Sequence, residues 1–271
     1  METIDYRGLE SLIFRLRETS GFDFSGYTRP SLMRRARLHL VKRAVSLSEL
    51  MTDIHRNEVA AYDLVQDLTV NYSEMFRDPD FFALLKSEVL SYFESCATFR
   101  IWVAGCASGE EAFSLSILLR ESGLIDKSII YATDLNKKIL ASAREGVFSL
   151  ARARNFSENY LKAGGNYSLS DYYQVSYGKA IMHHELRKKI IFSHHDLVGD
   201  GVFNEFQLIC CRNVMIYFTL EQRKKVLELL YESLSMYGYL CLGKRESLSY
   251  SGLEEKFRII SIPLNIYQKI L

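Results

Sequence analysis

The sequence has no long hydrophobic run and almost no imbalance of charge. No apolar stretch approaches the roughly 18 residues that span a membrane, so we expect no transmembrane segment. The 271 residues carry 34 Lys and Arg against 33 Asp and Glu, and a net charge of +1 predicts no nucleic-acid partner. The chain begins Met1-Glu2-Thr3 without the basic region of a secretory signal. We therefore expect a globular cytoplasmic protein.

The spacings that mark metal sites are also missing. Neither C-x-x-C nor H-E-x-x-H occurs, and the paired histidines His183-His184 and His194-His195 are direct neighbours. Adjacent residues of a strand point to opposite faces, so such a pair rarely binds one ion. We expect no metal. The five cysteines are odd in number, and we expect reduced thiols.

The most informative stretch runs from Arg100 to Leu119, with the sequence RIWVAGCASGEEAFSLSILL. A short apolar run meets a loop bounded by Gly105 and Gly109, and a periodic apolar helix follows. This order is typical of a nucleotide-type site, in which glycines let backbone N–H groups approach a ligand at a helix N-terminus.

Two features distinguish this loop from phosphate-binding loops. Its spacing is G-x-x-x-G, without the G-x-G-x-x-G of dinucleotide sites, and no Lys-Ser/Thr follows as in a P-loop. Glu110 and Glu111 would repel phosphates. The loop suits a ligand with cationic and hydroxyl groups, such as S-adenosylmethionine (SAM), and a nicotinamide dehydrogenase is disfavoured.

The pattern of hydrophobic residues divides the chain at about residue 68. Apolar residues at helical spacing predict helices over 6–18, from Pro30 to 43, over 47–56 and over 57–68. We expect residues 1–68 to form a small helical domain.

From residue 69 to 271 strands and helices alternate, which predicts a parallel sheet flanked by helices. The expected strands cover 99–103, 128–132, 189–193, 206–210 and 238–242. The expected helices cover 110–122, 135–144 and 220–235. The end of the chain predicts an antiparallel hairpin around Pro263, and the polar, Tyr-rich stretch 149–188 predicts a small inserted subdomain with a strand in YYQVSYG.

The helix after Pro30 is strongly basic on one side. Arg35, His39 and Lys42 follow one another at i, i+4 and i+7. Two further arginines lie alongside, and two apolar residues lie on the other side: Arg34, Arg37, Leu38 and Val41.

Polar residues also follow two predicted strands. Asp134 ends the second strand, 25 residues after Gly109, near the spacing of about 20 residues at which an acid binds a ribose. It could equally cap the next helix. Arg212-Asn213 follows a buried strand at the edge where open α/β sheets bind ligands, and Tyr217 comes soon after. Arg212 could also form a structural ion pair with an acid such as Glu111.

Together these motifs resemble the CheR-type chemotaxis receptor methyltransferases. The matching runs, in order, are NYSEMFRD, RIWVAGCASGEEAFSL, ATDLNKKILASAREGVF, CRNVMIYF and GYLCLGKRESL. The resemblance implies a Rossmann-like class I SAM-dependent methyltransferase fold over 69–271, a receptor-recognition domain over 1–68 and a β-subdomain near 149–188. It implies methyl transfer from SAM to receptor glutamates, which yields S-adenosylhomocysteine (SAH) and a methyl ester. Some relatives bind a receptor's C-terminal peptide with this subdomain.

The resemblance also implies roles for individual residues. Those that would hold the cofactor are Asn71, Ser73, Arg77, Gly105, Glu111, Asp134, Asp196, Leu197, Arg212 and Asn213. Arg77 and Tyr217 would face the incoming glutamate. The basic residues that would meet the acidic receptor helices are Arg34, Arg35, Arg37 and Lys42.

Three positions depart from the family pattern. Ser73 stands where threonine is usual, and Asp196 where asparagine is common. GKRES at 243–247 replaces Gly-His-Ser-Glu, which adds charge near the site and leaves the substrate open. The alternatives are a methyltransferase of another protein or of RNA, and a non-catalytic SAM sensor or scaffold. We expect a monomer.

Overall fold

The structure is a computed structural model and describes residues 4–271. The start of the chain, Met1-Glu2-Thr3, on which the expected absence of a signal rests, lies outside these residues. Contacts divide the chain into two compact units: residues up to 71 with 216–226, and residues 72–215 with 227–271.

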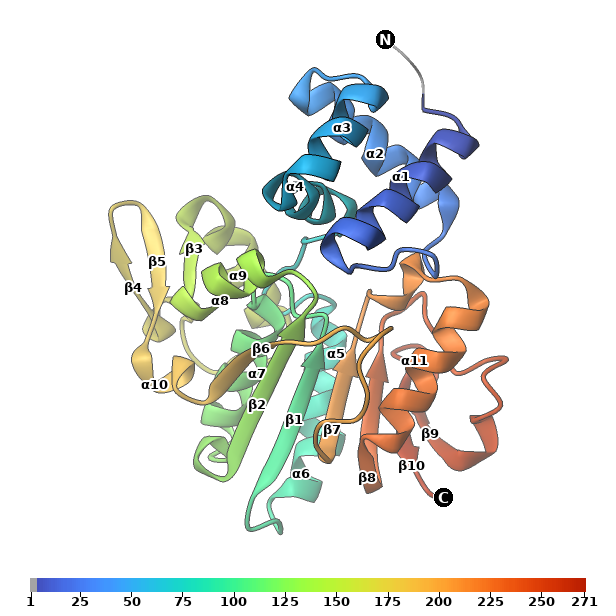
Figure 1. Cartoon of the computed structure of the whole chain (residues 1–271). Helices are drawn as coiled ribbons and strands as arrows, with labels where there is room; N and C mark the ends of the chain where they lie inside the picture. Colours follow the sequence, from blue (N-terminus) through green and yellow to red (C-terminus); the bar gives the residue numbers. More distant parts are fainter. Residues whose placement is uncertain (1–3) are drawn as a thin grey trace. The chain divides into compact units, whose positions relative to one another are not determined.

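The first unit is helical (Figure 1). Its helices before residue 71 are α1 (Tyr6–Ser20), α2 (Arg29–Arg43), α3 (Leu47–Arg56) and α4 (Glu58–Leu68), and they confirm the four predicted helices. Side-chain caps explain the starts of α1, α3 and α4, and Pro30 in the first turn favours the start of α2. Asp5 accepts the Gly8 N–H at 2.8 Å, and Ser46 with Glu49 forms a capping box at α3.

The second unit is built on a seven-stranded sheet of order β6-β2-β1-β7-β8-β10-β9. The strands are β1 (Phe99–Ala104), β2 (Ser128–Asp134), β6 (Ile190–His194), β7 (Phe206–Cys211), β8 (Leu234–Leu242), β9 (Phe257–Ser261) and β10 (Ile266–Lys269). The first five are parallel, and β10 runs antiparallel between β8 and β9, which confirms the predicted hairpin. The order of these strands, numbered along the chain, is 3-2-1-4-5-7-6, a Rossmann-like α/β arrangement.

Alternate residues of β1 explain how the sheet is covered. Phe99, Ile101 and Val103 lie in the core with residues of the following helical elements. These elements are α5 (Pro79–Leu84), a π-helical segment (Leu85–Val89), α6 (Leu90–Phe93), α7 (Glu110–Glu121) and α8 (Lys137–Glu145). On the other face Trp102 packs against Phe203 and Phe206, with ring centroids 5.1 and 5.3 Å away.

The predicted insert contains a small antiparallel sheet of order β3-β5-β4. Its elements are β3 (Val147–Ser149), α9 (Leu150–Lys162), β4 (Tyr173–Ser176), β5 (Lys179–Met182) and α10 (His184–Arg187). The strand expected in YYQVSYG is confirmed. The sequence analysis did not predict α9, because its polar composition leaves only Phe156 and Tyr160 buried.

Two predicted boundaries were wrong near the end of the chain. The helix expected over 220–235 is α11 (Leu220–Glu232), and β8 begins at Leu234 instead of residue 238. Ser233 separates the two elements, and its carbonyl accepts the Phe206 N–H at 2.9 Å. Pairing with β7 therefore starts earlier than the apolar run suggests.

Candidate functional site

Loops from five parallel strands of the second unit meet at one edge of its sheet. Ligands of open α/β sheets bind at the carboxyl ends of their strands. The loops after β1, β2, β6, β7 and β8 begin at Gly105, Leu135, His195, Arg212 and Gly243. The sequence therefore brings the candidate residues that follow these strands to a single edge, whereas Ser73 and Arg77 come from the segment before α5.

The glycine loop is fixed by its neighbours. Gly105 has φ 74°, in the left-handed region, and its N–H and that of Cys106 each donate to the Thr133 carbonyl at 2.8 Å. A β-carbon on Gly105 would lie 2.5 Å from Cγ2 of Val214. Close packing against the loop after β7 thus requires glycine here.

Asp134 fastens the glycine loop to the end of β2. Its Oδ2 accepts the Ala107 N–H at 2.8 Å, and its Oδ1 accepts the Asn136 N–H at 2.9 Å. Burial raises the pKa of Asp134, although these backbone donors act against the shift. Asn136, not Asp134, caps α8. Each carboxylate oxygen has a second lone pair, so Asp134 can still accept ligand hydroxyls.

The two acids that follow the glycine loop, at the start of α7, have different partners. The side chain of Glu110 is fully buried, and accepts from Ser108 Oγ at 2.6 Å and from Arg152 Nη1 at 2.8 Å. Burial raises the pKa of Glu110. Glu111 binds Arg212 Nη1 through Oε2 at 2.7 Å. Glu110 is thus a structural acid, whereas Glu111 belongs to the sheet edge.

Arg212 is a buried cation shared by two acids. Its side chain is 2% exposed, and Nη2 lies 2.8 Å from Asp78 Oδ2 in addition to the Glu111 contact. Nη2 also donates to the Arg77 carbonyl at 3.2 Å, and the guanidinium lies 3.9 Å from the Phe81 ring centroid. The ion pair with Glu111 is the one considered from the sequence. Through Glu111, Asp78 and the Arg77 carbonyl, Arg212 joins the start of α7 and the segment before α5 to the loop after β7.

Glu246 organises the loop after β7, and the sequence analysis did not single it out. Its carboxylate accepts the N–H groups of Asn213 at 2.8 Å, Met215 at 2.7 Å and Gly243 at 2.7 Å. Burial raises the pKa of Glu246. Asn213 has φ 62°, and these bonds hold it in that left-handed conformation. The fourth position of GKRES, which keeps the family's acid, is the signal that could have found it.

The remaining candidates of the second unit are less constrained. The Ser73 carbonyl accepts from Arg152, and Arg77 is half-buried with its guanidinium 6.0 Å from the Tyr72 ring. Asp196 Oδ1 accepts the Val198 N–H at 2.8 Å, so this acid shapes its own turn, and Leu197 is buried. Lys244 binds Asp78 at 3.0 Å, so the added charge of GKRES contacts the Arg212 cluster.

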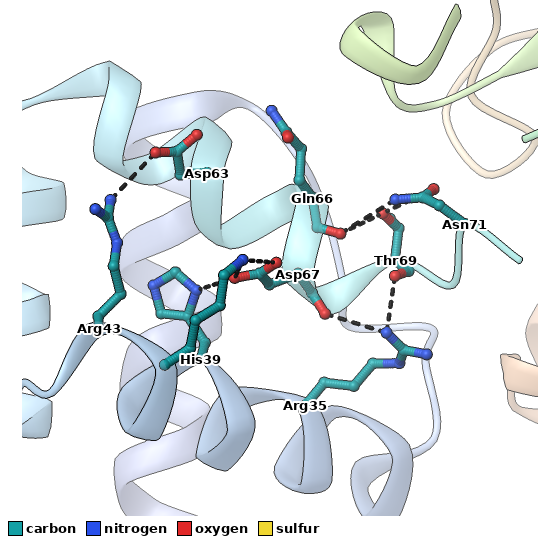
Figure 2. Close-up of polar contacts among 9 residues, drawn as sticks. Arg35, His39, Arg43, Asp63, Gln66, Asp67, Thr69 and Asn71 are labelled. Atoms are coloured by element: carbon teal, nitrogen blue, oxygen red, sulfur yellow. Dashed lines mark hydrogen bonds and ion pairs between the residues drawn. The ribbon is translucent and has the colours of Figure 1, made fainter. Parts of the chain in front are cut away.

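In the first unit Asn71 is tied to the end of α4 (Figure 2). Its Nδ2 donates to the Gln66 carbonyl at 3.3 Å, and Thr69 Oγ1 donates to Asn71 Oδ1 at 3.4 Å. Tyr217 is half-buried, and its carbonyl accepts the Thr28 N–H at 2.8 Å. Hydrogen bonds within this unit therefore fix the side chain of Asn71 and the backbone of Tyr217.

The basic side of α2 packs against α4 (Figure 2). His39 is 1% exposed and lies 2.7 Å from Asp67 through Nδ1, while Lys42 binds both oxygens of Asp67 at 2.9 and 3.0 Å. Arg35 donates to the carbonyls of Asp67 at 3.2 Å and Thr69 at 2.9 Å. The structure thus turns this charged side of α2 toward α4, with His39 buried and Lys42 at the exposed rim, because the end of α4 supplies its acceptors.

The outer side of α2 carries the two arginines that flank this row. Leu38 and Val41 are 62% and 55% exposed. Arg37 donates to the Ile4 carbonyl at 3.2 Å, and Arg34 is exposed. These four residues of α2 border a groove of about 690 Å³. Its lining consists of Ile4, Asp5, Tyr6, Pro30, Met33, Arg34, Arg37, Leu38 and Val41.

The part of the chain that the structure describes has neither a candidate metal site nor a helix suited to span a membrane. Among residues 4–271, no three or more His, Cys, Asp or Glu side chains are arranged to hold a metal ion. In the same part of the chain, no helix has both the length and the apolar character to cross a membrane. All five cysteines are free thiols, and four of them are buried.

Comparisons with known proteins point to one family. The family model described as CheR methyltransferase, SAM-binding domain, matches residues 71–266. A Pseudomonas putida protein that is by name the methyltransferase Cher3 is 40% identical over 92% of this chain and 91% of its own length. The chemotaxis protein methyltransferase of Listeria monocytogenes is 30% identical over 84% of this chain and 85% of its own. That of Vibrio parahaemolyticus is 30% identical over 84% and 83%.

Proposed function

The chain belongs to the CheR methyltransferase family, and we propose that it methylates glutamate side chains of chemotaxis receptors. It is a SAM-dependent methyltransferase, and SAM is its cofactor. The proposal adds the acceptor, which would become a glutamate methyl ester as SAM becomes SAH. We also propose that the enzyme acts as a cytoplasmic monomer, without a nucleic-acid partner.

The charges at the sheet edge fit a cofactor that has hydroxyl groups and positive charge but no phosphate. Asp134 has spare acceptor capacity beside the glycine loop. Arg212 and Lys244, which could attract a phosphate, are both paired with acids. The contact that carries this proposal is Arg212 bound to Glu111 and Asp78, because it fixes acids at the edge and leaves these cations neutralised.

A glutamate acceptor needs little help from a general base. The ordinary pKa of its carboxyl group is about 4.3, so it is ionised at neutral pH. The sulfonium of SAM supplies an activated methyl group. The protein must therefore align the reacting atoms and exclude water, and such positioning is worth several kcal/mol.

We assign the orientation of the acceptor to Arg77 and Tyr217. Charge is neutralised as the methyl group is transferred, so a tight bidentate clamp on the carboxylate would stabilise the ground state more than the transition state. Arg77 is half-buried, with weak contact to the Tyr72 ring, and is suited to a loose grip. The residues proposed to hold SAM are Asn71, Ser73, Arg77, Gly105, Glu111, Asp134, Asp196, Leu197, Arg212 and Asn213.

The outer side of α2 has the charge and apolar surface expected for binding an acidic helix. Arg34 and Arg37 border a groove together with the exposed apolar residues Leu38 and Val41. An amphipathic helix with acids beside its apolar stripe would match both features. In this proposal Arg35 and Lys42 contribute by holding α2 against α4, because their groups are already bound there.

Transfer of a labelled methyl group tests the proposed function. The protein is incubated with tritiated-methyl SAM and a membrane fraction from its host, and the labelled product is treated with alkali. We expect label on a membrane protein that alkali releases, as from a carboxyl ester. Alkali-stable label, label in RNA, or no label although SAM binds would contradict the glutamate acceptor.

A further inference from the structure

The helix α9 supports the loop that leads to Arg77, and neither the family comparison nor the sequence motifs assigned it a role. Four of its residues, at i, i+4, i+7 and i+8, share one face: Arg152, Phe156, Asn159 and Tyr160. The loop, residues 72–76, carries Ser73 and ends directly before Arg77.

Two hydrogen bonds and a ring contact join this face of α9 to the loop. Arg152 Nη2 donates to the Ser73 carbonyl, and Asn159 Nδ2 donates to the Met75 carbonyl at 3.2 Å. The Tyr160 and Phe76 rings pack edge to face with centroids 5.2 Å apart. The loop is therefore held over most of its length by a helix that begins the insert.

The loop also has an unusual backbone that needs such support. Phe76 at the end of the loop has φ 51°, and Asp78 just beyond it has φ 56°. Both lie in the left-handed region that non-glycine residues rarely adopt. Ser114 of α7 accepts the Phe76 N–H at 2.9 Å from the other side. The conformation thus depends on contacts from α7 and α9 together.

Arg152 is the residue that joins these elements. One guanidinium nitrogen binds the buried Glu110 at 2.8 Å, and the other binds the backbone of Ser73. The guanidinium also lies 4.9 Å from the Phe156 ring centroid and 5.8 Å from that of Tyr72. Its planar fork can reach two acceptors at once, which a lysine cannot do in the same way.

We propose that Arg152 is a positioning residue of the SAM site: it fixes the loop that carries Ser73 and leads to Arg77 relative to α7, the helix that follows the glycine loop. This inference rests on the proposed roles of Ser73 and Arg77. It assigns Arg152 no contact with SAM: the residue acts through the backbone of the loop.

Calorimetric titration of the full chain with SAH tests this role. We expect Arg152→Gln to weaken SAH binding by about tenfold or more, since small displacements of binding groups cost this much. Arg154→Gln is the matched control, because Arg154 lies on the same helix, is 91% exposed and pairs with Glu158 one turn further along that helix. Its affinity should equal that of the wild type. Arg152→Lys should be intermediate.

A double variant separates positioning from simple charge balance. Glu110→Gln removes the buried carboxylate that Arg152→Gln would leave without its cation. In the double variant we expect thermal stability to recover but SAH affinity to remain weak. Recovery of both, or Arg152→Gln binding SAH within about twofold of the wild type, would overturn the inference. No SAH binding by the folded wild type would instead refute the cofactor site on which it rests.

Discussion

Two clusters of charged residues, one in each unit, use arginine in different ways. In the second unit Arg212 is a buried cation that binds the side chains of Glu111 and Asp78. In the first unit Asp67 is an acid surrounded by His39 and Lys42, and Arg35 beside it binds backbone carbonyls. One cluster collects ionised side chains at the sheet edge, and the other fastens two helices.

This difference shows how the same residue type serves chemistry or architecture. A cation that binds acids fixes the charges near a ligand site, whereas a cation that binds carbonyls satisfies the end of a helix. The sequence marks both arginines as conspicuous, because each lies in a polar pattern. What distinguishes them is that Arg212 binds two carboxylates in addition to the Arg77 carbonyl, whereas Arg35 donates to two backbone carbonyls.

Loss of Arg212 should have the largest effect. Arg212→Met would leave Glu111 and Asp78 without their shared cation, and breaking a buried pair costs about 3–5 kcal/mol of unfolding free energy. Urea unfolding measures this change. Lys244→Ala is the control, because Lys244 also binds Asp78 but is half exposed and should matter by less than about 1 kcal/mol. Equal losses in both variants would contradict the buried-cation account.

The neighbouring pair Arg34 and Arg35 sharpens the comparison on one helix. Arg35→Met should lower the free energy of unfolding by about 1–3 kcal/mol, because two carbonyls lose a charged donor. Arg34→Met should leave stability within about 0.5 kcal/mol, because its side chain is exposed. Receptor methylation by Arg34→Met should fall. A loss of stability in Arg34→Met but not in Arg35→Met would refute the inward placement of Arg35.

The Asp67 cluster should make the free energy of unfolding depend on pH, with a smaller effect than the two substitutions above. Burial alone would raise the pKa of Asp67, but hydrogen bonds from Lys42 and His39 outweigh it and hold the pKa below its ordinary value. The folded state therefore binds the proton less readily than the unfolded state. The resulting stability is present above about pH 4 and is lost as pH falls through the folded pKa.

Asp67→Asn should remove this contribution, about 1 kcal/mol at neutral pH, because Lys42 is largely exposed and solvent screens its contact with Asp67. Unfolding of both proteins is measured from pH 7 down to about pH 3. The difference in unfolding free energy should shrink on the acid side of pH 4. A difference that stays constant or grows there would show that Asp67 is not stabilised as an anion.

Most of the fold could be predicted from periodicity. The four helices before residue 68, the five parallel strands and the closing hairpin follow from apolar spacing and one proline. The helix α9 could not, because its apolar residues serve contacts with a distant loop instead of a continuous stripe. The start of β8 depended on pairing with β7, which periodicity does not report.

Candidate residues could be predicted from the sequence where they lie at the end of a predicted strand. Asp134 and Arg212 follow buried strands, and parallel strands must end at one edge. Arg152 was missed because it acts on the backbone of Ser73, which carries no sequence signal. Glu246 was missed because the acid kept in GKRES does not reveal that it binds the backbone of the loop after β7. On α2 the charged row was visible, but its direction was not, since the acceptors come from α4.

Calorimetry with SAH, on the wild type and on Asp134→Asn, tests most directly whether SAM lies at the carboxyl edge of the sheet. The account predicts binding by the wild type and an affinity about 10 to 100 times weaker for Asp134→Asn, since hydrogen bonds to a charged group are worth about 1.5–3 kcal/mol. Equal affinities in two proteins that unfold alike, or no heat with the folded wild type, would contradict it.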